Sequence, residues 1–509
     1  MHTQHNVFAV LFLLAVWGGS LQSTPANGAD AVGKPNIIFF FVDDMGWQDT
    51  SVPFHTEVTA LNKRYRTPNM ERLAARGMKF TQAYACAVCS PTRVSWITGL
   101  NAARHGVTNW TLRKDRSPDR NHPVIQPPAW NLNGLSPTPG VARTVHAVTL
   151  PMLLREAGYR TIHVGKAHFG AKGTPGENPL NLGFDVNVAG HAPGGPGSYY
   201  AKNNFSAAFR NADRIWDIPG LEKYHGTDTY LNEALTIEAN RAVDRAIADG
   251  KPFYLYMSHY AVHAPWEADH RFLEKYTDAG LKGLPAVFAS MIESMDKSLG
   301  DILDNLKRHG IEENTIVVFM SDNGCPSNLP RNLPLRGHKI TPYEGGTRVP
   351  LIVRWPGVVG QGTRCDDYLI IEDVFPTFLE MASVAEYEQI GGTIDGVSFV
   401  PLLRGEPPAD PQRPIFWHFP NTYGEPPYSS VRKGDWKLIY QHVTRKLELY
   451  NLREDIGEEK NLAADRPEKL RELAQVLTDF LEEAGALLPT DKQTGKRVEY
   501  PIAHVEDSP

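Results

Sequence analysis

The stretch NIIFFFV, residues Asn36 to Val42, decides the fold of this chain. It is apolar at every position after the first, and two acids, Asp43 and Asp44, follow it directly. A continuously apolar run of this length is typical of a strand that is buried on both faces, as in a parallel sheet. Three similar runs lie farther along the chain: YRTIHV at 159–164, FYLYM at 253–257 and TIVVFM at 315–320.

Helical patterns alternate with these runs. One helix is predicted to begin after Thr67, which stands at a cap position and is followed by Pro68. Gly77 marks the position just past its end. Apolar residues at helical spacing predict a longer helix that ends near Gly310, and we expect this apolar stripe to pack in the core. The stripe consists of Phe288, Met291, Met295, Leu299, Ile302 and Leu306. The alternation predicts an α/β fold with a large, mainly parallel sheet flanked by helices.

Composition narrows the class of protein. The chain has 509 residues, of which 41% are hydrophobic and 22% charged, close to globular averages and unlike a disordered or collagen-like chain. Its 52 basic and 58 acidic residues give a net charge of -6. This is the wrong sign for a general binder of phosphate backbones, so we expect no nucleic-acid partner.

The N-terminus resembles an export signal. Residues 7–17 form an apolar run, and small residues follow near Gly28 and Ala29. Eleven apolar residues are too few to cross a bilayer, which needs about twenty. We therefore expect a signal peptide at 1–29, no transmembrane anchor, and an exported protein in the periplasm or outside the cell.

The remaining chain divides into two unequal parts. Residues 30–404 form the expected α/β catalytic domain, and the Pro-rich segment 405–414 resembles a linker. Residues 415–488 form a smaller α+β unit, an antiparallel sheet with strands at 415–419, 436–440 and 447–450 and a helix at about 467–484. Residues 489–509 are expected to be a mobile tail. Two stretches rich in Gly, Pro and aromatic residues, 110–140 and 170–219, are expected to shape a binding cleft.

Acidic and amide side chains follow two of the predicted strands. Asp43 and Asp44 follow the first, and Asp322 and Asn323 follow the fourth. Ligands of open parallel sheets bind beyond the carboxyl ends of the strands, so these four groups should converge. Three carboxylates in one crevice require a cation, and an all-oxygen set favours Ca²⁺ or Mg²⁺ over Zn²⁺. The alternative is that both motifs only cap helices and form turns.

Cationic and imidazole side chains follow the other strands. Lys166 and His168 come after the run at 159–164, His259 and His263 come after the run at 253–257, and His338 and Lys339 come after the second acidic motif. Around a metal they would hold a small tetrahedral dianion. Taken singly, each is more often a core or solvated residue.

Cys89 opens a further motif, Cys89-Ser90-Pro91-Thr92-Arg93, at a plausible entry from a loop into a helix. Cys86 and Cys89 also form a C-x-x-C pair, but the chain has no second such pair for zinc and no thioredoxin-like context. A structural, half-buried cysteine is the alternative.

The motif Cys89-x-Pro91-x-Arg93 with Thr98-Gly99 resembles the signature of the formylglycine-dependent (type I) sulfatases of the alkaline phosphatase superfamily. The resemblance extends over nearly the whole chain after the signal: residues 36–47, 165–168, 321–324, 335–350, 373–379 and 447–452. It implies that a formylglycine-generating or sulfatase-maturing enzyme oxidises Cys89 to formylglycine, whose hydrate supplies the attacking oxygen.

The resemblance also implies roles for the other residues. Arg93 would stabilise the hydrate. Asp43, Asp44, Asp322 and Asn323, with the modified Cys89, would hold Ca²⁺. Lys166, His168, His263 and Lys339 would bind sulfate and move protons, with His168 as the base for sulfate release and His263 or Lys339 as the acid for the leaving group.

The chain departs from the family pattern at several positions. Ala167 replaces a frequent Trp, His263 precedes Ala-Pro instead of following Pro, and His338 stands where a small residue is usual. The choice between His259 and His263 stays open for this reason. If Cys89 is modified, three thiols remain, those of Cys86, Cys325 and Cys365. They allow at most one disulfide.

The leading hypothesis is an exported sulfatase that acts on sugars of a sulfated polysaccharide or glycosaminoglycan rather than on free aryl esters. A second hypothesis is a phosphodiester or phosphonate monoester hydrolase of the same superfamily. A third is a binding protein that has kept the fold and lost turnover.

Overall fold

The computed structural model describes residues 33–327, 332–384 and 392–506. The export signal predicted at 1–29 lies outside them. Among the described helices, none is both long and apolar enough to cross a lipid bilayer.

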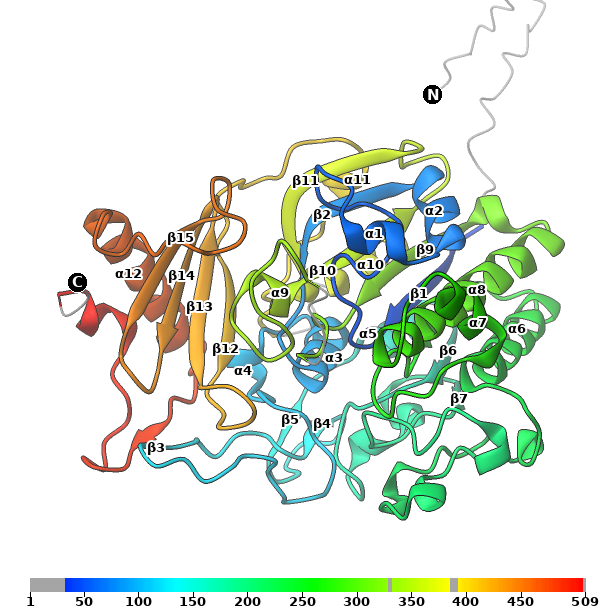
Figure 1. Cartoon of the computed structure of the whole chain (residues 1–509), viewed down its shortest axis with the longest axis horizontal. Helices are drawn as coiled ribbons and strands as arrows, with labels where there is room; N and C mark the ends of the chain where they lie inside the picture. Colours follow the sequence, from blue (N-terminus) through cyan, green and yellow to red (C-terminus); the bar gives the residue numbers. More distant parts are fainter. Residues whose placement is uncertain (1–32, 328–331, 385–391, 507–509) are drawn as a thin grey trace, which may run out of the picture. The chain divides into compact units, whose positions relative to one another are not determined.

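The central sheet has eight strands, in the spatial order β11 (Thr363–Ile370), β2 (Met78–Tyr84), β10 (Arg348–Arg354), β9 (Thr315–Ser321), β1 (Asn36–Val42), β8 (Phe253–Ser258), β6 (Arg160–Gly165) and β7 (Val186–Val188) (Figure 1). The strands from β9 to β7 are parallel to one another. β10 is antiparallel to both β9 and β2. The mainly parallel α/β fold is thus confirmed, and all four predicted strands lie in its parallel part.

β1 is apolar throughout because both faces of the sheet are covered. Ile37, Phe39 and Phe41 belong to one hydrophobic cluster, and Ile38 and Phe40 belong to a second on the opposite face. Figure 1 shows helices on both sides of the sheet. Helices α3 (Cys89–Thr98), α5 (Leu150–Glu156) and α10 (Val374–Met381) pack in the first cluster, and α2 (Pro68–Ala75), α6 (Leu231–Ala248) and α8 (Leu284–Arg308) in the second.

The C-terminal part contains an antiparallel sheet covered by a helix, as predicted, and this sheet has four strands instead of the expected three. The strands are β12 (Ile415–Phe419), β13 (Tyr428–Lys433), β14 (Trp436–Gln441) and β15 (Leu447–Asn451), and the helix is α12 (Pro467–Glu483). Phe416 of the sheet stacks on Phe480 of the helix with ring centroids 3.8 Å apart. The sequence did not predict β13, whose YSSVRK is too polar to stand out.

The expectation of a mobile tail does not hold for residues 490–504. β16 (Thr490–Asp491) pairs with β3 (Ile125–Gln126), and the short helix η10 (Pro501–His504) packs near α12. Val498 is buried in the same cluster as α12. The few apolar residues of this segment are enough to hold it against the C-terminal sheet.

A buried charge network joins the C-terminal sheet to the segment that carries Lys339. Lys437 of β14 lies 2.9 Å from Glu344 and 3.0 Å from Glu458, and all three side chains are inaccessible to solvent. Buried charges persist only when they are paired, so this network fixes the register between the two parts.

Glu372, in the short helix η8 (Ile371–Asp373), is a buried carboxyl whose ionisation opposes folding. Asn101 donates a 2.6 Å hydrogen bond to its Oε1. Burial, followed by the nearby carboxylates of Asp373 and Asp395, raises the pKa of Glu372 to about 8. Between the usual Glu pKa of about 4.3 and this value, the folded chain keeps a proton that the unfolded chain releases. The stabilisation of the folded state by this bound proton is therefore complete at low pH, and it is lost as pH rises through this window.

We expect Glu372→Gln to remove this part of the pH dependence. In urea unfolding at about pH 5 and about pH 9, the wild type should lose on the order of 2–5 kcal/mol more stability than the variant. Glu468→Gln, on an exposed position of α12, is the control and should follow the wild type. An unchanged pH dependence in Glu372→Gln would contradict a protonated buried carboxyl.

Candidate active site

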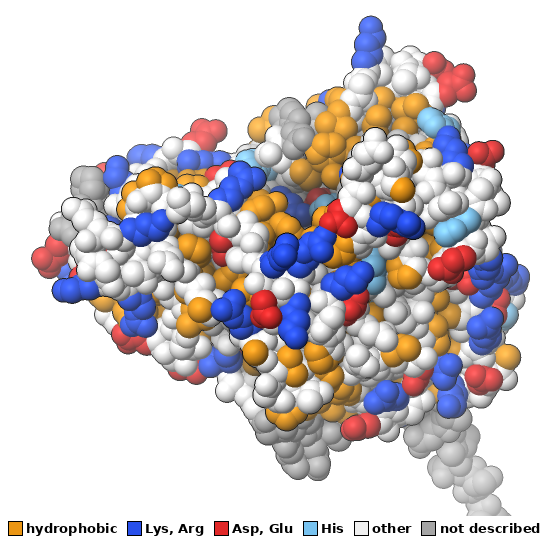
Figure 2. All heavy atoms as spheres, turned by 90° about the horizontal axis from the view of Figure 1, so that it is seen from below, with side chains coloured by type: hydrophobic (Ala, Val, Ile, Leu, Met, Phe, Trp, Pro, Cys, Tyr) orange, Lys and Arg blue, Asp and Glu red, His pale blue; other side chains and the backbone are white. Residues whose placement is uncertain are grey.

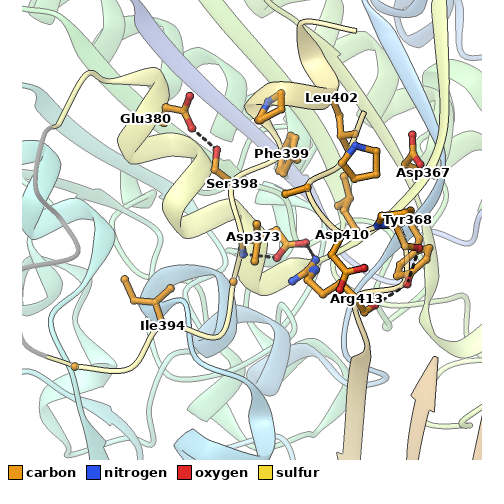
Figure 3. A pocket seen from close by; sticks show the side chains of 18 residues that line it. Asp367, Tyr368, Asp373, Glu380, Ile394, Ser398, Phe399, Leu402, Asp410 and Arg413 are labelled. Carbon is orange, nitrogen blue, oxygen red and sulfur yellow. Dashed lines mark hydrogen bonds and ion pairs between the residues drawn. The ribbon is translucent and has the colours of Figure 1, made fainter. Parts of the chain in front are cut away.

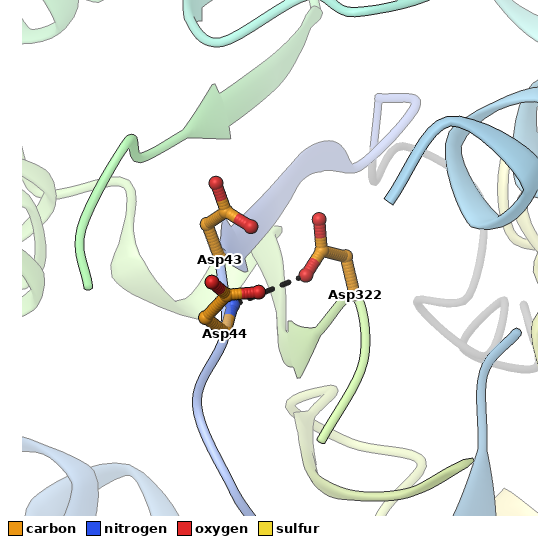
Figure 4. Close-up of side chains that lie close together, drawn as sticks. All are labelled: Asp43, Asp44 and Asp322. Carbon is orange, nitrogen blue, oxygen red and sulfur yellow. Dashed lines mark hydrogen bonds between the residues drawn. The ribbon is translucent and has the colours of Figure 1, made fainter. Parts of the chain in front are cut away.

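The carboxylates of Asp43, Asp44 and Asp322 converge at the carboxyl ends of β1 and β9 (Figure 4). The two strands are neighbours and parallel, so the residues that follow them leave the sheet together. One oxygen from each carboxylate lies within 4.8 Å of the others, and all three side chains are buried. Asp44 adopts a left-handed backbone (φ 59°), and its N–H donates to Asp322 Oδ1 at 3.2 Å. The predicted convergence is confirmed.

The cluster fits a hard cation. Burial, and then the charge of Asp322, raise the pKa of Asp43 well above its usual value. Among the described residues, Asp43 Oδ1 and Asn323 Oδ1 are buried without a hydrogen-bond donor. Asn323 places its Nδ2 on Asp44 Oδ1 at 2.7 Å, which holds the amide beside the carboxylates. Unpartnered oxygens of this kind are the ligands that Ca²⁺ and Mg²⁺ prefer.

Two lysines face the carboxylates. Lys166, after β6, pairs with Asp43 and lies 3.9 Å from Asp322. Lys339 donates to Asp44 Oδ1 at 2.5 Å. Burial opposes the charge of Lys339, but Asp44 and its neighbours raise its pKa well above the usual value. Burial alone would raise the pKa of Asp44. The charges of Lys339 and then His263 outweigh this effect, so the pKa of Asp44 lies below its usual value.

Arg93 is fully buried on α3 and is held by hydrogen bonds to protein groups. Its Nε and Nη2 both donate to Asp322 Oδ2, at 3.2 and 2.8 Å, and its Nη1 donates to Ser258 Oγ at 2.7 Å and Tyr256 OH at 3.0 Å. Asp322 has a lowered pKa because Arg93, and then Lys166, outweigh the effect of burial. The sequence did not predict Tyr256 and Ser258, whose role depends on the pairing of β8 beside β1.

Cys89 is the first residue of α3 and lies one helical turn before Arg93. It is buried, and it experiences the charges of Lys166, Lys339, Asp43 and Asp322. Burial raises the pKa of its thiol although both lysines oppose the shift. An unmodified Cys89 is thus mostly protonated at neutral pH and is a poor nucleophile. No disulfide joins the four cysteines, all of which lie in the described part of the chain.

The structure separates His263 from His259. His263 Nε2 lies 4.0 Å from Asp44 Oδ2, its side chain is 25% exposed, and burial lowers its pKa to about 4. His259 points the other way, because its Nε2 lies 2.9 Å from Ser298 Oγ on α8 and its ring packs on Phe40. His263 therefore belongs to the site and His259 to the packing between sheet and helix.

His168 is buried in a left-handed conformation (φ 56°) next to the site. Its Nε2 lies 2.8 Å from the Thr111 carbonyl, which accepts a hydrogen bond, so the neutral ring carries its proton on Nε2. Nδ1 has no partner among the described residues and is left as a base. Burial, and then the charges of Lys166 and Arg93, lower the pKa of His168 well below its usual value.

Three residues of the long stretches at 110–140 and 170–219 lie against the histidines of this site. Thr111 of the first contacts His168, and Gly194 and Gly195 of the second lie against the histidines. A Cβ on Gly194 would be 2.3 Å from the His168 ring, and one on Gly195 would be 2.8 Å from His263 Nδ1. These glycines permit a close approach that no other residue allows.

Positive charge gathers near these stretches. Strands β3, β4 (Gly134–Ser136) and β5 (Thr144–His146) lie at the lower edge of Figure 1, and Figure 2 shows that side of the molecule. Lys and Arg side chains lie around a hollow on this face, with His and some Asp and Glu side chains among them. Such a surface favours anionic ligands.

A separate cavity of about 690 Å³ lies beside β11, α10 and the segment that leads to β12 (Figure 3). Asp373 and Arg413 form a 2.5 Å ion pair in its wall. It contains none of the predicted site residues, and the ion pair holds the connecting segment in place.

Comparisons with known proteins match most of this chain. The family model described as sulfatase matches residues 35–384, and the model described as N-sulphoglucosamine sulphohydrolase, C-terminal, matches residues 338–486. A protein of Formosa agariphila named sulfatase is 31% identical and covers 92% of this chain and 91% of its own length. The N-acetylgalactosamine-6-sulfatase of Mus musculus is 32% identical and covers 77% of this chain and 70% of its own length.

The solved structure of Ps i-CgsB superimposes with a TM-score of 0.70 at 26% identity and covers 88% of this chain and 93% of its own. The matches therefore include both the central sheet and the C-terminal part. Because a family model matches well over half of its residues, this chain belongs to the sulfatase family of the alkaline phosphatase superfamily and is a sulfuric ester hydrolase.

Proposed function

We propose that this chain is an exported sulfatase that hydrolyses sulfate monoesters on sugars of a sulfated polysaccharide or glycosaminoglycan, with a formylglycine derived from Cys89 and a bound Ca²⁺. The observation that carries the proposal is the buried cluster of Asp43, Asp44 and Asp322 with two lysines beside it. A sulfate monoester repels nucleophiles through its own negative charge, so its hydrolysis needs such cations around the equatorial oxygens.

The residues for the cation are Asp43, Asp44, Asp322 and Asn323. Their unpartnered oxygens support an oxygen-liganded ion, and Cys89 as a further ligand stays a prediction. When bound, the ion would withdraw charge from the sulfate. Lys166 and Lys339 each pair with a carboxylate of the cluster, and we assign them to bind the remaining sulfate oxygens.

Formylglycine would supply a geminal diol, of which one hydroxyl attacks the sulfur and the other expels sulfate and restores the aldehyde. A serine at position 89 could perform the first step but would stay sulfated. The raised pKa of the Cys89 thiol supports this assignment, because it argues against the thiolate as nucleophile. Conversion requires a maturing enzyme, and Arg93, one turn along the helix, is assigned to stabilise the hydrate.

His168 is assigned as the base for sulfate release because its Nδ1 is unprotonated and buried without a partner among the described residues. The acid for the leaving oxygen is Lys339 or His263. Lys339 keeps its proton at neutral pH, whereas His263 would gain one only when the negatively charged sulfate group of the ester approaches its Nε2.

We expect His263→Ala to lower kcat/KM about 10²- to 10⁴-fold, the range of a positioned acid or base. His259→Gln is the matched control, because this ring contacts Ser298 on α8 and should affect stability more than catalysis. Steady-state assays with both variants measure the difference. Equal losses of activity in the two variants would contradict the assignment of His263 to the site.

The preference for sugars rests on the long stretches beside the site, on the predicted export and on the similarity to an N-acetylgalactosamine-6-sulfatase. A panel of sulfated mono- and oligosaccharides, an aryl sulfate and matching phosphate esters tests it. We expect sulfate release from at least one sulfated sugar at a higher kcat/KM than from the aryl sulfate. Release from none of the sulfate esters by protein with modified Cys89 would overturn the proposal.

The same panel tests the phosphodiester and phosphonate alternative. Within the residues that the structure describes, one group of three or more acidic, His or Cys ligands is found, whereas two-metal phosphatases need further ligands. Faster hydrolysis of phosphodiesters than of sulfate esters would favour the alternative. A chain that binds sulfated sugar without turnover would favour the binding protein.

A further inference from the structure

Two aromatic side chains from distant parts of the sequence meet beside the catalytic centre. Trp110 lies in the first long stretch, and Tyr423 lies in the connection between β12 and β13. Their ring centroids are 5.5 Å apart at an interplanar angle of 72°. Both side chains are partly exposed.

The aromatic pair is held in place by Asp119. Its carboxylate accepts hydrogen bonds from Trp130 Nε1 at 2.8 Å, from Asn421 Nδ2 at 3.1 Å and from the Thr422 N–H at 3.0 Å. The backbone N–H of Arg120 also donates to the Thr422 carbonyl at 2.9 Å. These contacts hold the segment around Asp119 against residues 421–422, so the loop that carries Tyr423 is fixed before a ligand binds.

The pair borders the catalytic residues on two sides. Thr111, next to Trp110, donates its N–H to Ser90 Oγ at 3.1 Å and accepts from His168 at its carbonyl. Gly424, next to Tyr423, lies against Ile340, which follows Lys339: a Cβ on this glycine would be 2.8 Å from Ile340 Cδ1. Trp110 is thus next in sequence to a residue that contacts the neighbour of Cys89, and Tyr423 is next to a residue that lies against the neighbour of Lys339.

Polar groups complete the rim. The guanidinium of Arg120 lies over the Tyr423 ring, 5.7 Å from its centroid, and is exposed. His338 Nε2 lies 3.7 Å from Glu425 Oε1, with about a third of each side chain exposed. Aromatic faces with a few fixed polar groups are the composition of a site for a sugar ring.

We propose that Trp110, Tyr423 and Arg120 form a subsite for the sugar next to the sulfated one, and that this neighbouring sugar carries an acidic group. The aromatic faces pack against the ring carbons, and Arg120 pairs with a carboxylate or a second sulfate. This inference rests on the proposed function and specifies its substrate: an oligosaccharide with anionic groups on adjacent sugars, rather than a monosaccharide.

The test compares kcat/KM for a sulfated monosaccharide with kcat/KM for disaccharides whose second sugar is neutral, carboxylated or sulfated. The wild type should prefer the acidic disaccharides to the monosaccharide. Tyr423→Ala should reduce the preference for every disaccharide by about tenfold, and Arg120→Gln should reduce it by about tenfold for the acidic ones alone. The carboxylated and sulfated substrates show which anion Arg120 prefers.

A second Arg and Tyr pair in the C-terminal part provides matched controls. The Arg497 guanidinium lies 5.2 Å from the Tyr500 ring, Tyr500 packs against the cluster around α12, and Arg497 is exposed. Tyr500→Ala and Arg497→Gln should leave the preference unchanged. Equal losses on the monosaccharide and on all disaccharides in Tyr423→Ala and Arg120→Gln would overturn the subsite. A wild type that hydrolyses none of these substrates would instead overturn the proposed function. Because Arg120 is exposed, its variant stays informative if Tyr423→Ala fails to fold.

Discussion

Cys89→Ala abolishes turnover, with a loss of at least about 10⁴-fold, while its melting temperature stays nearly the same as that of the wild type. The expected loss is large because the proposed hydrate is the nucleophile and its second hydroxyl also releases the product. The expected change in stability is small because alanine lacks only the oxygen atoms of the formylglycine side chain, or the sulfur of an unmodified cysteine, at a buried position, at a cost on the order of 1 kcal/mol. Sulfate release and differential scanning calorimetry measure the two quantities on the same preparation.

Cys86→Ala is the matched control for Cys89→Ala. Cys86 is also buried, three residues earlier in the same motif, and its thiol contacts Ser95. It should keep activity within a few fold of the wild type. A substantial residual activity in Cys89→Ala, or an equal loss in Cys86→Ala, would show that position 89 is part of the packing rather than of the chemistry.

Cys89→Ser distinguishes the diol from a simple nucleophile. A serine hydroxyl at the start of α3 has no second hydroxyl to expel the sulfate. We therefore expect at most one sulfate ester cleaved for each enzyme molecule and a sulfated protein as the end product. Intact-protein mass spectrometry after exposure to substrate detects the adduct, and repeated turnover by this variant would contradict the proposed release step.

Removal of the cation has the second largest expected effect. A chelator should lower activity at least about 10³-fold, because the sulfate charge is then met only by the lysines. Ca²⁺ should restore activity better than Zn²⁺, because every assigned protein ligand is an oxygen. Ca²⁺ should also raise the melting temperature, since an ion at about 100 times its Kd stabilises the folded state by about 2.7 kcal/mol.

Asp43→Asn tests whether this cluster holds the ion. Its Oδ1 has no donor among the described residues, so the substitution removes a ligand charge without breaking a protein contact at that atom. The increase in melting temperature with Ca²⁺ should be lost. Asp304→Asn, on the exposed face of α8, should keep it. Full activity of a metal-free preparation, or an unchanged response to Ca²⁺ in Asp43→Asn, would contradict the metal assignment.

Much of the fold could be predicted because burial on both faces leaves a plain signal in the sequence. The apolar side chains of β1 point alternately into two hydrophobic clusters on opposite faces of the sheet, and β8 and β9 repeat this pattern. Strands at the other side of the sheet were missed for local reasons. β10 has Pro350 in its middle, and β11 begins TRCDDY, so neither resembles a buried strand. Only the neighbouring strands make these segments extended.

The site residues could be predicted where their position depends on the ends of strands, but not where it depends on the direction in which a side chain points. Asp43 and Asp322 follow neighbouring parallel strands, so their convergence follows from the topology. His259 and His263 follow the same strand, and the sequence does not show that one ring turns to Ser298 and the other to Asp44. The partners of Arg93 on β8 and the rim around Tyr423 likewise depend on contacts between distant segments.

The mass of the peptide that contains Cys89, taken from catalytically active protein purified from its native host, tests the central claim most directly. The account predicts a peptide in which the thiol sulfur has been replaced by an aldehyde oxygen, in proportion to the activity of the preparation. An unmodified thiol in protein that hydrolyses sulfate esters at full rate would contradict it.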